Sequence, residues 1–584
     1  MSDRGEGRIS GWKKTGVLSK AILVLSILMF LCAFWSGPIQ QPQGLEVAFV
    51  SVVMAGVFFI ILCASARVAF SFMATGIFFL LISVTAYLKQ TYLGNAFLVS
   101  DIYYLTGTHI LTTIWKFPHI RVLMVVLPLL SLALLGMAWR YSWTPFHAGH
   151  RLRRAMVRVT GLAISIVLMG WVLLPHGPFS PMFQKSMWVA INQDAHLTSF
   201  FMSINALKVE LPNVHNTPEQ NARWNKLASG IVGDERKHDP TRPDIVVVLE
   251  ESTFDPSTLP ACDIPQCQNH GLIEPNAWTK ASGPMISHVY GGGTALSEFD
   301  VLTGLNYGIF GLAGGYAPWS VAPRIRDSFP MQLRRLGYKT IAVYTVDGGY
   351  MNAREAYNDY GFDAFYDAPS LGLKAWGATD DEMFAAAKRV YEQERAKSNQ
   401  PVFLMLKTIE QHGPHNNHPL ATLPAPYNQG LFPNLSPEAQ LNLSNYLARM
   451  DASDKAMEGL EKYFLGRSRP TIVMSFGDHK PNFSGVMNEL KITPPDGYKG
   501  DPKYITYFKL DTNFSTPELP SFPATDIVYL PEFVLQAGSL PGNDYFAATE
   551  HLRNVCDGLS AECTDKSTLY SYYAWLFSDH KVFQ

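Results

Sequence analysis

The chain has 584 residues, a formal net charge of -2 and a hydrophobic fraction of 47%. It has no basic excess that could neutralise a phosphate backbone, which argues against a nucleic-acid-binding protein. The length predicts several domains, and the apolar residues are concentrated in roughly the first 175, so we expect a membrane part followed by a polar part.

Five apolar stretches approach or reach the length of about 20 residues that a helix needs to cross a bilayer. They cover residues 19–35, 45–64, 68–88, 122–139 and 156–174. Buried core helices are the alternative, but five such stretches with almost no charges are rare in soluble proteins. A cleavable signal peptide would explain only the first, and no small-residue cleavage pattern follows it. We therefore predict a five-span transmembrane domain over residues 1–175.

Lysine and arginine predict the orientation of these spans. The N-terminal segment carries Arg4, Arg8, Lys13, Lys14 and Lys20, and Arg67 connects the second and third spans. The loop between the fourth and fifth spans carries Arg140, Arg151, Arg153 and Arg154. Positive loops stay in the cytoplasm. The N-terminus is then cytoplasmic, and everything after about residue 175 is extracytoplasmic.

The connection of about residues 89–121 is long and contains aromatic and polar residues, so it could lie at the membrane–water interface. Contact with a lipid and simple anchoring are equally open for it. Residues 176–242 are polar and irregular, with several prolines, and are expected to form a linker with short helices.

Four of the six cysteines fall in the polar part as two local pairs, Cys262 with Cys267 and Cys556 with Cys563. An oxidising compartment makes two small disulfide loops the expected arrangement. A four-cysteine zinc site is the alternative, but the pairs are far apart and lack CxxC spacing.

Short apolar runs alternate with helical patterns from residue 243 onwards. The runs cover residues 244–252, 340–345, 402–406 and 471–476, and the helical patterns cover 329–336, 380–397 and 437–464. Such alternation predicts an α/β domain with a mostly parallel sheet over residues 243–584. Ligands of these sheets bind beyond the carboxyl ends of the strands.

Acidic and imidazole side chains stand at these expected strand ends. They are Glu250, Glu251, Asp347, Glu410, His412, Asp478 and His479. Each alone has a structural explanation, such as helix capping or a surface loop. Together they favour a divalent metal site, because carboxylate with imidazole suits Mn²⁺ or Zn²⁺.

A Gly-Gly-Gly-Thr segment, residues 291–294, lies between the first two strands and precedes a helical pattern. Backbone amides at such a loop can converge on an anion, which makes Thr294 a candidate nucleophile for phosphorus or sulfur. A glycine-rich turn capped by threonine is the structural alternative. Threonine needs activation, which a nearby metal ion provides.

The five-span pattern, the strand ending Glu-Ser, the segment Thr-x-x-x-Glu-Phe-x-x-Leu-Thr-Gly and the Gly-Asp-His triplet resemble the lipoteichoic acid synthase and membrane-bound phosphoglycerol transferase group. That group belongs to the alkaline phosphatase–sulfatase superfamily, so the resemblance, over about residues 243–535, implies an alkaline phosphatase-like fold. It implies Thr294 as the nucleophile and as a ligand of one divalent metal. Glu251, Asp478 and His479 would be the other ligands, with Glu250 an open alternative to Glu251.

The resemblance also implies substrate contacts. His412 matches a histidine that contacts the head group, and Asn352 and Arg354 match a segment that holds the head-group phosphate. The tryptophan and arginine of the lipoteichoic acid branch would fall at Met351 and Ala353, and neither agrees. Arg354 is one position later and could substitute. Mn²⁺ is the favoured cofactor, with Zn²⁺ or Mg²⁺ as alternatives.

The leading functional hypothesis is a transferase in a bacterial inner membrane, with its catalytic domain in the periplasm or exterior. It would move phosphoglycerol from phosphatidylglycerol to a glycan or glycolipid. The alternative enzyme is a phosphoethanolamine transferase acting on lipid A or a glycan, and the non-enzymatic alternative is a membrane-anchored binding or regulatory protein. A sulfatase activity is not expected, because no Cys/Ser-x-Pro-x-Arg motif follows the glycines.

Overall fold

The computed structural model describes residues 6–93, 96–101, 103, 118–144, 151–174, 176–183, 196–206, 209–228, 242–268 and 270–584. The chain divides into two compact units, the first within residues 1–208 and the second including residues 209–584.

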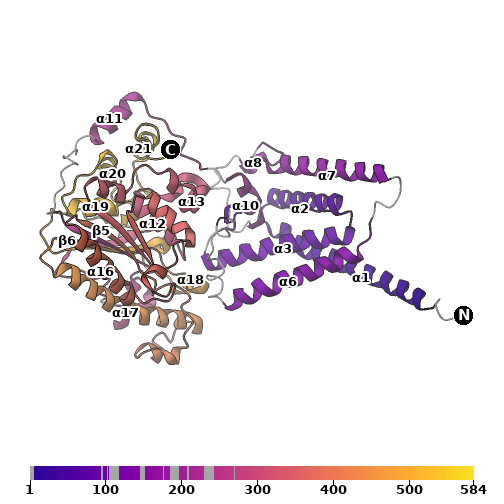
Figure 1. The fold of residues 1–584 in the computed structure, drawn as a ribbon, viewed down its shortest axis with the longest axis horizontal. Coiled ribbons are helices and arrows are strands. Elements are labelled where there is room, and N and C mark those ends of the chain that lie inside the picture. The colour runs from indigo at the N-terminus through magenta and orange to yellow at the C-terminus, as the bar shows by residue number, and fades with distance from the viewer. Residues whose placement is uncertain are drawn as a thin grey trace. The chain divides into compact units, whose positions relative to one another are not determined.

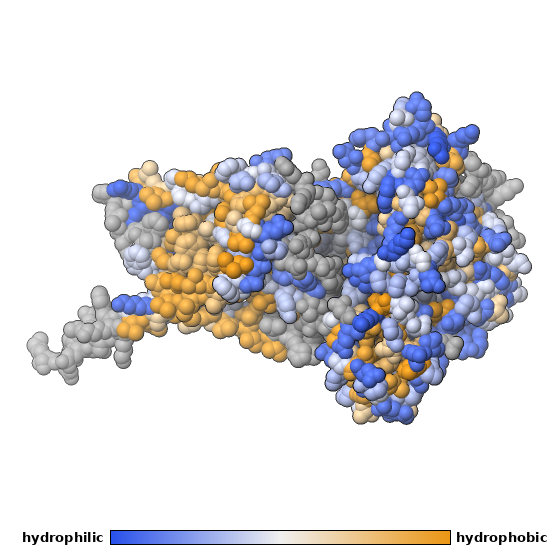
Figure 2. Space-filling model, turned by 180° about the vertical axis from the view of Figure 1, so that it is seen from behind, coloured by the Kyte–Doolittle hydropathy of each residue, from blue (hydrophilic) through white to orange (hydrophobic). Residues whose placement is uncertain are grey.

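The first unit is helical (Figure 1). Its long helices are α1 (Glu6–Ser36), α2 (Gly44–Ser65), α3 (Val68–Leu93), α6 (Pro118–Tyr141) and α7 (Arg151–Leu173), and its short ones include α8 (Ser180–Phe183) and α10 (His196–Met202). Helix α2 packs against α7, and α1 packs against α6. On the face shown in Figure 2, the coloured surface of this unit is predominantly apolar.

Among the described residues, four helical stretches are long and apolar enough to cross a membrane: Gly16–Gln40, Gly44–Ser65, Val68–Gln90 and Leu152–Leu173. They coincide with four of the five predicted spans. The remaining predicted span, residues 122–139, lies inside α6. The described apolar part of that helix, Val125–Tyr141, is shorter than the other four stretches. The structure therefore supports four spans on length and composition and leaves α6 as a shorter candidate.

Two arginines lie at the same end of the helix bundle. Arg158 of α7 donates from Nε to the carbonyl oxygen of Cys63, at 3.0 Å, near the C-terminus of α2. Arg67, which connects α2 and α3, lies over the ring of Trp139 at the end of α6, 4.4 Å from its centroid. Basic side chains near helix C-termini satisfy the last carbonyl groups, so these contacts cap the bundle with positive charge.

The second unit is built on an eight-stranded sheet with the order β4-β3-β5-β1-β6-β7-β2-β8. The strands are β1 (Asp244–Glu250), β2 (Thr279–Ile286), β3 (Lys339–Tyr344), β4 (Ala364–Asp367), β5 (Val402–Lys407), β6 (Thr471–Gly477), β7 (Ile505–Thr512) and β8 (Thr525–Asp526). From β4 to β6 all neighbours are parallel, whereas β7 runs antiparallel to both β6 and β2. The four predicted strands are β1, β3, β5 and β6, and the prediction of a mostly parallel sheet is confirmed.

Helices cover both faces of this sheet, which explains why its central strands are continuous apolar runs. Every residue of β1 is buried: Ile245 and Val247 pack into one core, and Val246 and Val248 into the other. On the first face lie α12 (Thr294–Thr303), α14 (Phe329–Arg335) and α19 (Leu530–Ala537), and on the second lie α16 (Asp380–Lys397) and α17 (Pro437–Leu465) (Figure 1).

Further segments complete the unit. Helix α11 (Pro218–Ala228) packs on α20 (Asp544–Val555) and α21 (Lys566–Trp575), where Trp224 Nε1 donates to Ser571 Oγ at 3.0 Å. Both predicted disulfides are present, Cys262–Cys267 and Cys556–Cys563, with Cα atoms 5.4 and 4.5 Å apart. The zinc alternative for these cysteines is thereby excluded.

A buried ion cluster ties α12 to the edge strand β8. His288 Nδ1 lies 2.6 Å from Asp300 Oδ2, and its Nε2 lies 3.2 Å from Asp526 Oδ1. Burial alone would lower the pKa of His288, but Asp526 and Asp300 raise it to about 10. The imidazolium therefore compensates two buried carboxylates immediately before the glycine loop.

We predict that His288→Gln destabilises the second unit by about 3 kcal/mol near pH 7, because it leaves two buried carboxylates without their cation. The pKa of His288 is higher in the folded state than its ordinary value, so its stabilisation is complete below about pH 6.5 and is lost as the pH rises through about 10. Denaturant unfolding of both proteins at several pH values tests this. A stability gap that stays constant from pH 7 to pH 10 would contradict it.

Candidate active site

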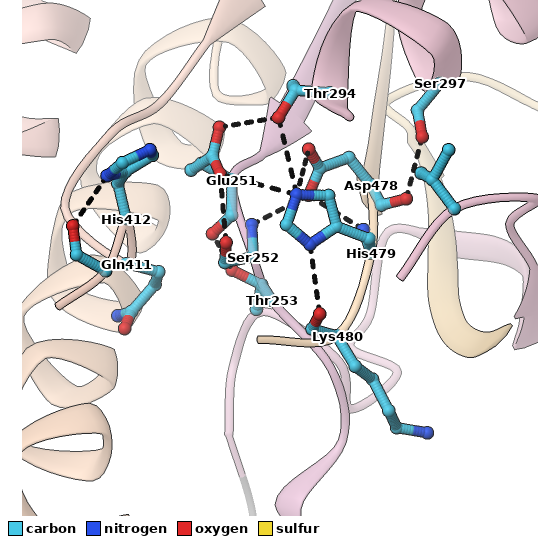
Figure 3. A network of polar contacts seen from close by, with 12 residues as sticks. Glu251, Ser252, Thr253, Thr294, Ser297, Gln411, His412, Asp478, His479 and Lys480 are labelled. Carbon is cyan, nitrogen blue, oxygen red and sulfur yellow. Dashed lines mark hydrogen bonds and ion pairs between the residues drawn. The ribbon is translucent and has the colours of Figure 1, made fainter. Parts of the chain in front are cut away.

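Three metal-ligating side chains converge where β1 and β6 end. Glu251, Asp478 and His479 each offer a ligand atom, and these atoms lie within 4.8 Å of one another (Figure 3). His479 Nε2 is 3.7 Å from Glu251 Oε1 and 3.5 Å from Asp478 Oδ2, and all three side chains are buried. The sheet creates this proximity, because β1 and β6 are parallel neighbours with Glu250 opposite Gly477.

Backbone contacts fix the direction of these side chains. The amides of Ser252 and His479 donate to Asp478 Oδ1, at 2.7 and 2.8 Å. His479 Nδ1 lies 3.0 Å from the carbonyl oxygen of Lys480, which can only accept, so Nδ1 carries the proton. His479 Nε2 faces the two carboxylates and is the ring nitrogen in position to bind a metal ion.

The glycine loop brings Thr294 to the same place. Gly291 and Gly293 have φ values of 72° and 99°, a left-handed conformation that favours glycine. Thr294 is the first residue of α12, and its hydroxyl donates to Glu251 Oε2 at 3.1 Å and lies 3.4 Å from His479 Nε2. The amide of Gly291 donates to the carbonyl oxygen of Lys480 at 3.0 Å, which fastens the loop to the end of β6.

The cluster has the character of a cation site. Asp478 Oδ2 is buried and makes no hydrogen bond in the described part of the chain, although His479 is close. The pKa of Asp478 is raised to about 7, mainly by burial, with His479 opposing the rise and Glu251 adding to it. Two buried carboxylates are costly without a compensating charge. Two carboxylates, an imidazole and a hydroxyl fit a divalent metal ion such as Mn²⁺ or Zn²⁺.

The structure also distinguishes the two adjacent acids. Glu251 belongs to the cluster, whereas Glu250 is the last residue of β1 and is not part of it. Burial raises the pKa of Glu250 well above its ordinary value, and Asp380 adds to this effect. Of the two adjacent acids, Glu251 is therefore the one in position to bind a metal.

A buried ion pair that the sequence did not indicate supports the helix of Thr294. Lys407 Nζ, at the end of β5, lies 2.9 Å from Glu298 Oε1, and both side chains are buried. Glu298 is four residues after Thr294, so both lie on one side of the first turns of α12. Burial opposes the charge of Glu251, but His412, Lys407 and His479 lower its pKa overall. The only feature of the sequence that could have indicated a role for Lys407 is its position at the end of a predicted strand.

His412 follows β5 and lies on the other side of Glu251 from His479 (Figure 3). Its Nδ1 is 2.7 Å from the carbonyl oxygen of Gly413. Its ring meets that of Trp376 edge to face, with centroids 5.0 Å apart, and Trp376 meets Tyr350 in the same way at 4.8 Å. Trp376 has a φ of 64°, unusual for a bulky residue, and nothing in the sequence pointed to it.

Asn352 and Arg354 make other contacts. Asn352 Nδ2 donates to the carbonyl oxygen of Pro318 at 2.8 Å. The guanidinium of Arg354 forms an ion pair with Asp367, at the end of β4, and lies over the ring of Phe365. Among the described residues, neither contacts the cluster of Glu251, Thr294, Asp478 and His479.

Comparison with known proteins gives similarities of several kinds. An uncharacterized protein of Haemophilus influenzae is 25% identical over 386 residues, which cover 64% of this chain and 68% of that protein. A putative cyclic β-1,2-glucan modification protein of Rhizobium meliloti is 24% identical over 367 residues, covering 59% of this chain and 53% of its own length.

Two solved structures are also similar. The phosphoglycerol transferase GacH of Streptococcus pyogenes, in complex with sn-glycerol-1-phosphate, matches with a TM-score of 0.46 and 18% identity, over 64% of this chain and 99% of that one. The lipooligosaccharide phosphoethanolamine transferase EptA of Neisseria meningitidis matches with a TM-score of 0.49 and 13% identity, over 87% of this chain and 95% of that one.

The family model described as Sulfatase matches residues 243–508, the segment that contains β1 to β6 and all the side chains of the cluster. The second unit of this chain is therefore similar to the sulfatase family over these residues, which make up a little under half of the chain.

Proposed function

We propose that this protein is a membrane-anchored transferase that moves phosphoglycerol from phosphatidylglycerol to an extracytoplasmic glycan or glycolipid, with Thr294 as the nucleophile. The observation that carries the proposal is the hydroxyl of Thr294, which lies 3.1 Å from Glu251 Oε2 inside a buried cluster of two carboxylates and an imidazole. A hydroxyl at the start of a helix and beside such a cluster is suited to attack a phosphodiester.

Glu251, Asp478, His479 and the hydroxyl of Thr294 would hold one divalent metal ion, for which we favour Mn²⁺ over Zn²⁺ or Mg²⁺. When bound, such an ion lowers the pKa of a neighbouring hydroxyl and stabilises negative charge on phosphoryl oxygens. Contacts within the protein orient the Thr294 hydroxyl and the Asp478 carboxylate. Glu251 accepts a hydrogen bond from Thr294, and the backbone amide of Ser252 donates to Asp478 and holds its carboxylate in place.

The reaction would proceed in two steps, each a transfer of the phosphoglyceryl group. Thr294 Oγ forms a bond to phosphorus, the bond from phosphorus to the diacylglycerol oxygen breaks, and that oxygen takes up a proton in exchange for the one that Thr294 loses. An acceptor hydroxyl then attacks the phosphothreonine diester, Thr294 Oγ is regenerated with a proton, and the acceptor hydroxyl loses one. His412, beside Glu251, is the proposed head-group contact or proton carrier.

Asn352 and Arg354 remain proposed contacts of the head-group phosphate. To take this role they would exchange their partners, the carbonyl oxygen of Pro318 and the carboxylate of Asp367, for phosphate oxygens. Arginine suits such an exchange because its guanidinium binds carboxylate and phosphate with the same geometry.

Two sequence features favour phosphoglycerol as the transferred group. Glu298-Phe299 and Leu302-Thr303-Gly304 resemble the phosphoglycerol branch. The name of the Rhizobium meliloti relative, a putative glucan modification protein, is consistent with a glycan acceptor. A phosphoethanolamine transferase acting on lipid A or a glycan is the alternative, because Thr294-Ala295-Leu296-Ser297 also resembles that branch.

Thr294→Ala should reduce lipid turnover at least about 1,000-fold while the protein keeps its metal, since the hydroxyl forms the bond to phosphorus and three metal ligands remain. Asp478→Asn and His479→Ala should lose turnover together with the metal. The measurements are turnover of labelled phosphatidylglycerol and phosphatidylethanolamine, and metal content by elemental analysis.

The matched control is Thr568→Ala, which removes a threonine from the first turns of α21 and should leave turnover unchanged. Normal turnover by Thr294→Ala would discard the mechanism. Turnover of phosphatidylethanolamine instead of phosphatidylglycerol would keep the mechanism and select the alternative function.

We also propose that α6 is a fifth span. Its 24 residues extend about 36 Å as a helix, enough for a hydrocarbon core of about 30 Å. An odd number of spans places the N-terminus and the second unit on opposite sides of the membrane. Arg67 and Arg158 lie at one end of the bundle, which is the pattern expected of the cytoplasmic side.

Reporter fusions after residues 150 and 240 should therefore report the cytoplasm and the exterior, respectively. Such fusions read the side of the membrane directly and do not depend on enzymatic activity. If both fusions report the same side, the five-span topology is wrong.

A further inference from the structure

The loop that carries His412 is held from outside the site by one side chain, Arg449 of α17. Its Nη1 donates to the carbonyl oxygens of Glu410 and His412, at 3.3 and 3.0 Å. Its Nη2 donates to the carbonyl oxygen of Pro414 at 2.9 Å and to Asn417 Oδ1 at 2.7 Å. One guanidinium thus spans eight residues of loop, with a hydrogen bond to the carbonyl group of His412 itself.

The geometry of these four hydrogen bonds requires an arginine. The planar guanidinium presents several N–H groups in a fixed fork, whereas a lysine ammonium is a compact point charge on a flexible stem. The Arg449 side chain is half-buried, and three of its four acceptors are backbone carbonyl oxygens. A cation bonded mainly to loop carbonyl groups restrains the path of that loop.

A second anchor holds the other end of the same loop. Asp380, the first residue of α16, accepts hydrogen bonds from the amides of Ile409 and Glu410, both at 3.2 Å. Its other oxygen accepts from the hydroxyl of Ser453 at 2.6 Å. Ser453 is one helical turn after Arg449 on α17, so a single face of that helix supports the loop at both points.

The imidazole of His412 is thereby restrained on two sides. Arg449 fixes its backbone through the carbonyl oxygen, and Trp376 contacts its ring edge to face. The His412 side chain lies beside Glu251, on the side away from His479 (Figure 3). A shift of the loop would therefore move His412 relative to Glu251 and Thr294 without altering the metal ligands.

We propose that Arg449 is a positioning residue of the transferase: it holds the loop of residues 410–417 so that the His412 imidazole keeps its orientation beside Glu251 and Thr294 during turnover. The inference rests on the proposed function of His412. It assigns Arg449 no contact with substrate or metal, and its effect on the reaction passes through His412 alone.

A double-mutant cycle tests this. Arg449→Ala should lower kcat/KM for phosphatidylglycerol about 100-fold, because small misplacements of a reacting group have effects of this size. In a His412→Ala background the same change should cost no more than about twofold, since the group that it positions is already absent. Metal content should equal that of the wild type in every variant.

Three further measurements separate positioning from a general loss of structure. Guanidinium ion added to Arg449→Ala should restore part of the lost kcat/KM, and Arg449→Lys should restore little, because the ammonium cannot reproduce the fork. The matched control is Arg467→Ala, which removes an arginine that contacts Glu392 and Tyr463 just beyond α17 and should leave kcat/KM unchanged. Thermal unfolding of the full chain in detergent reports folding for each variant.

Losses from Arg449→Ala and His412→Ala that multiply in the double mutant would overturn the inference, as would full activity of Arg449→Ala. Full activity of His412→Ala would instead refute the role given to His412 in the proposed function and remove the basis for the inference. If Arg449→Ala does not fold, Arg449→Lys in the two backgrounds decides by the same criterion.

Discussion

The structure depends on the parallel pairing of β1 with β6. This pairing places the C-terminal ends of two buried strands side by side. Glu251, which follows β1, therefore lies close to Asp478 and His479, which follow β6. Two carboxylates in a buried position repel each other and lose their hydration. Two features of the site offset this cost: the hydroxyl of Thr294, which donates to Glu251, and the capacity of these side chains to bind a divalent ion.

Other contacts of the domain fasten α12 and the neighbouring loops to that edge of the sheet. The glycine loop is fastened by Gly291 to the end of β6, and α12 is fastened by Glu298 to Lys407 on β5. Behind the loop, His288 neutralises two carboxylates that connect α12 with the antiparallel edge of the sheet. On the opposite side, Arg449 and Asp380 hold the loop of His412. Apart from the neutral backbone hydrogen bond of Gly291, these tethers are ionic or charge-assisted contacts, and together they keep the side chains of the site in place.

Part of this arrangement could be predicted from the sequence. The runs at β1, β3, β5 and β6 are apolar because both faces of those strands are covered, and polar residues mark their ends. The antiparallel strand β7 was missed, although it is fully buried, since its sequence Ile-Thr-Tyr-Phe-Lys-Leu-Asp-Thr mixes charges that the fold pairs internally. Lys509 of that strand lies 2.9 Å from Glu461 of α17, a partner that only the tertiary structure reveals.

At the site, too, the sequence could not predict those contacts whose partners are brought together only by the tertiary structure. Thr294, Asp478 and His479 stand in short local patterns, and the structure brings them together. Lys407, Trp376 and Arg449 act through residues far away in sequence, so no local pattern indicates them. Arg354 illustrates the converse: its local segment suggested phosphate, and in the structure its guanidinium is paired with Asp367. Identity of the partner, and not of the residue itself, decides what a charged side chain does.

The most direct test of the central claim is the mass of the peptide that contains Thr294 after the metal-loaded protein has been incubated with phosphatidylglycerol in the absence of an acceptor. The account predicts that this peptide gains the mass of one phosphoglyceryl group, that fragmentation places the group on Thr294, and that adding the acceptor removes it. Lipid turnover without any such modification, or with the group on another residue, would contradict the account.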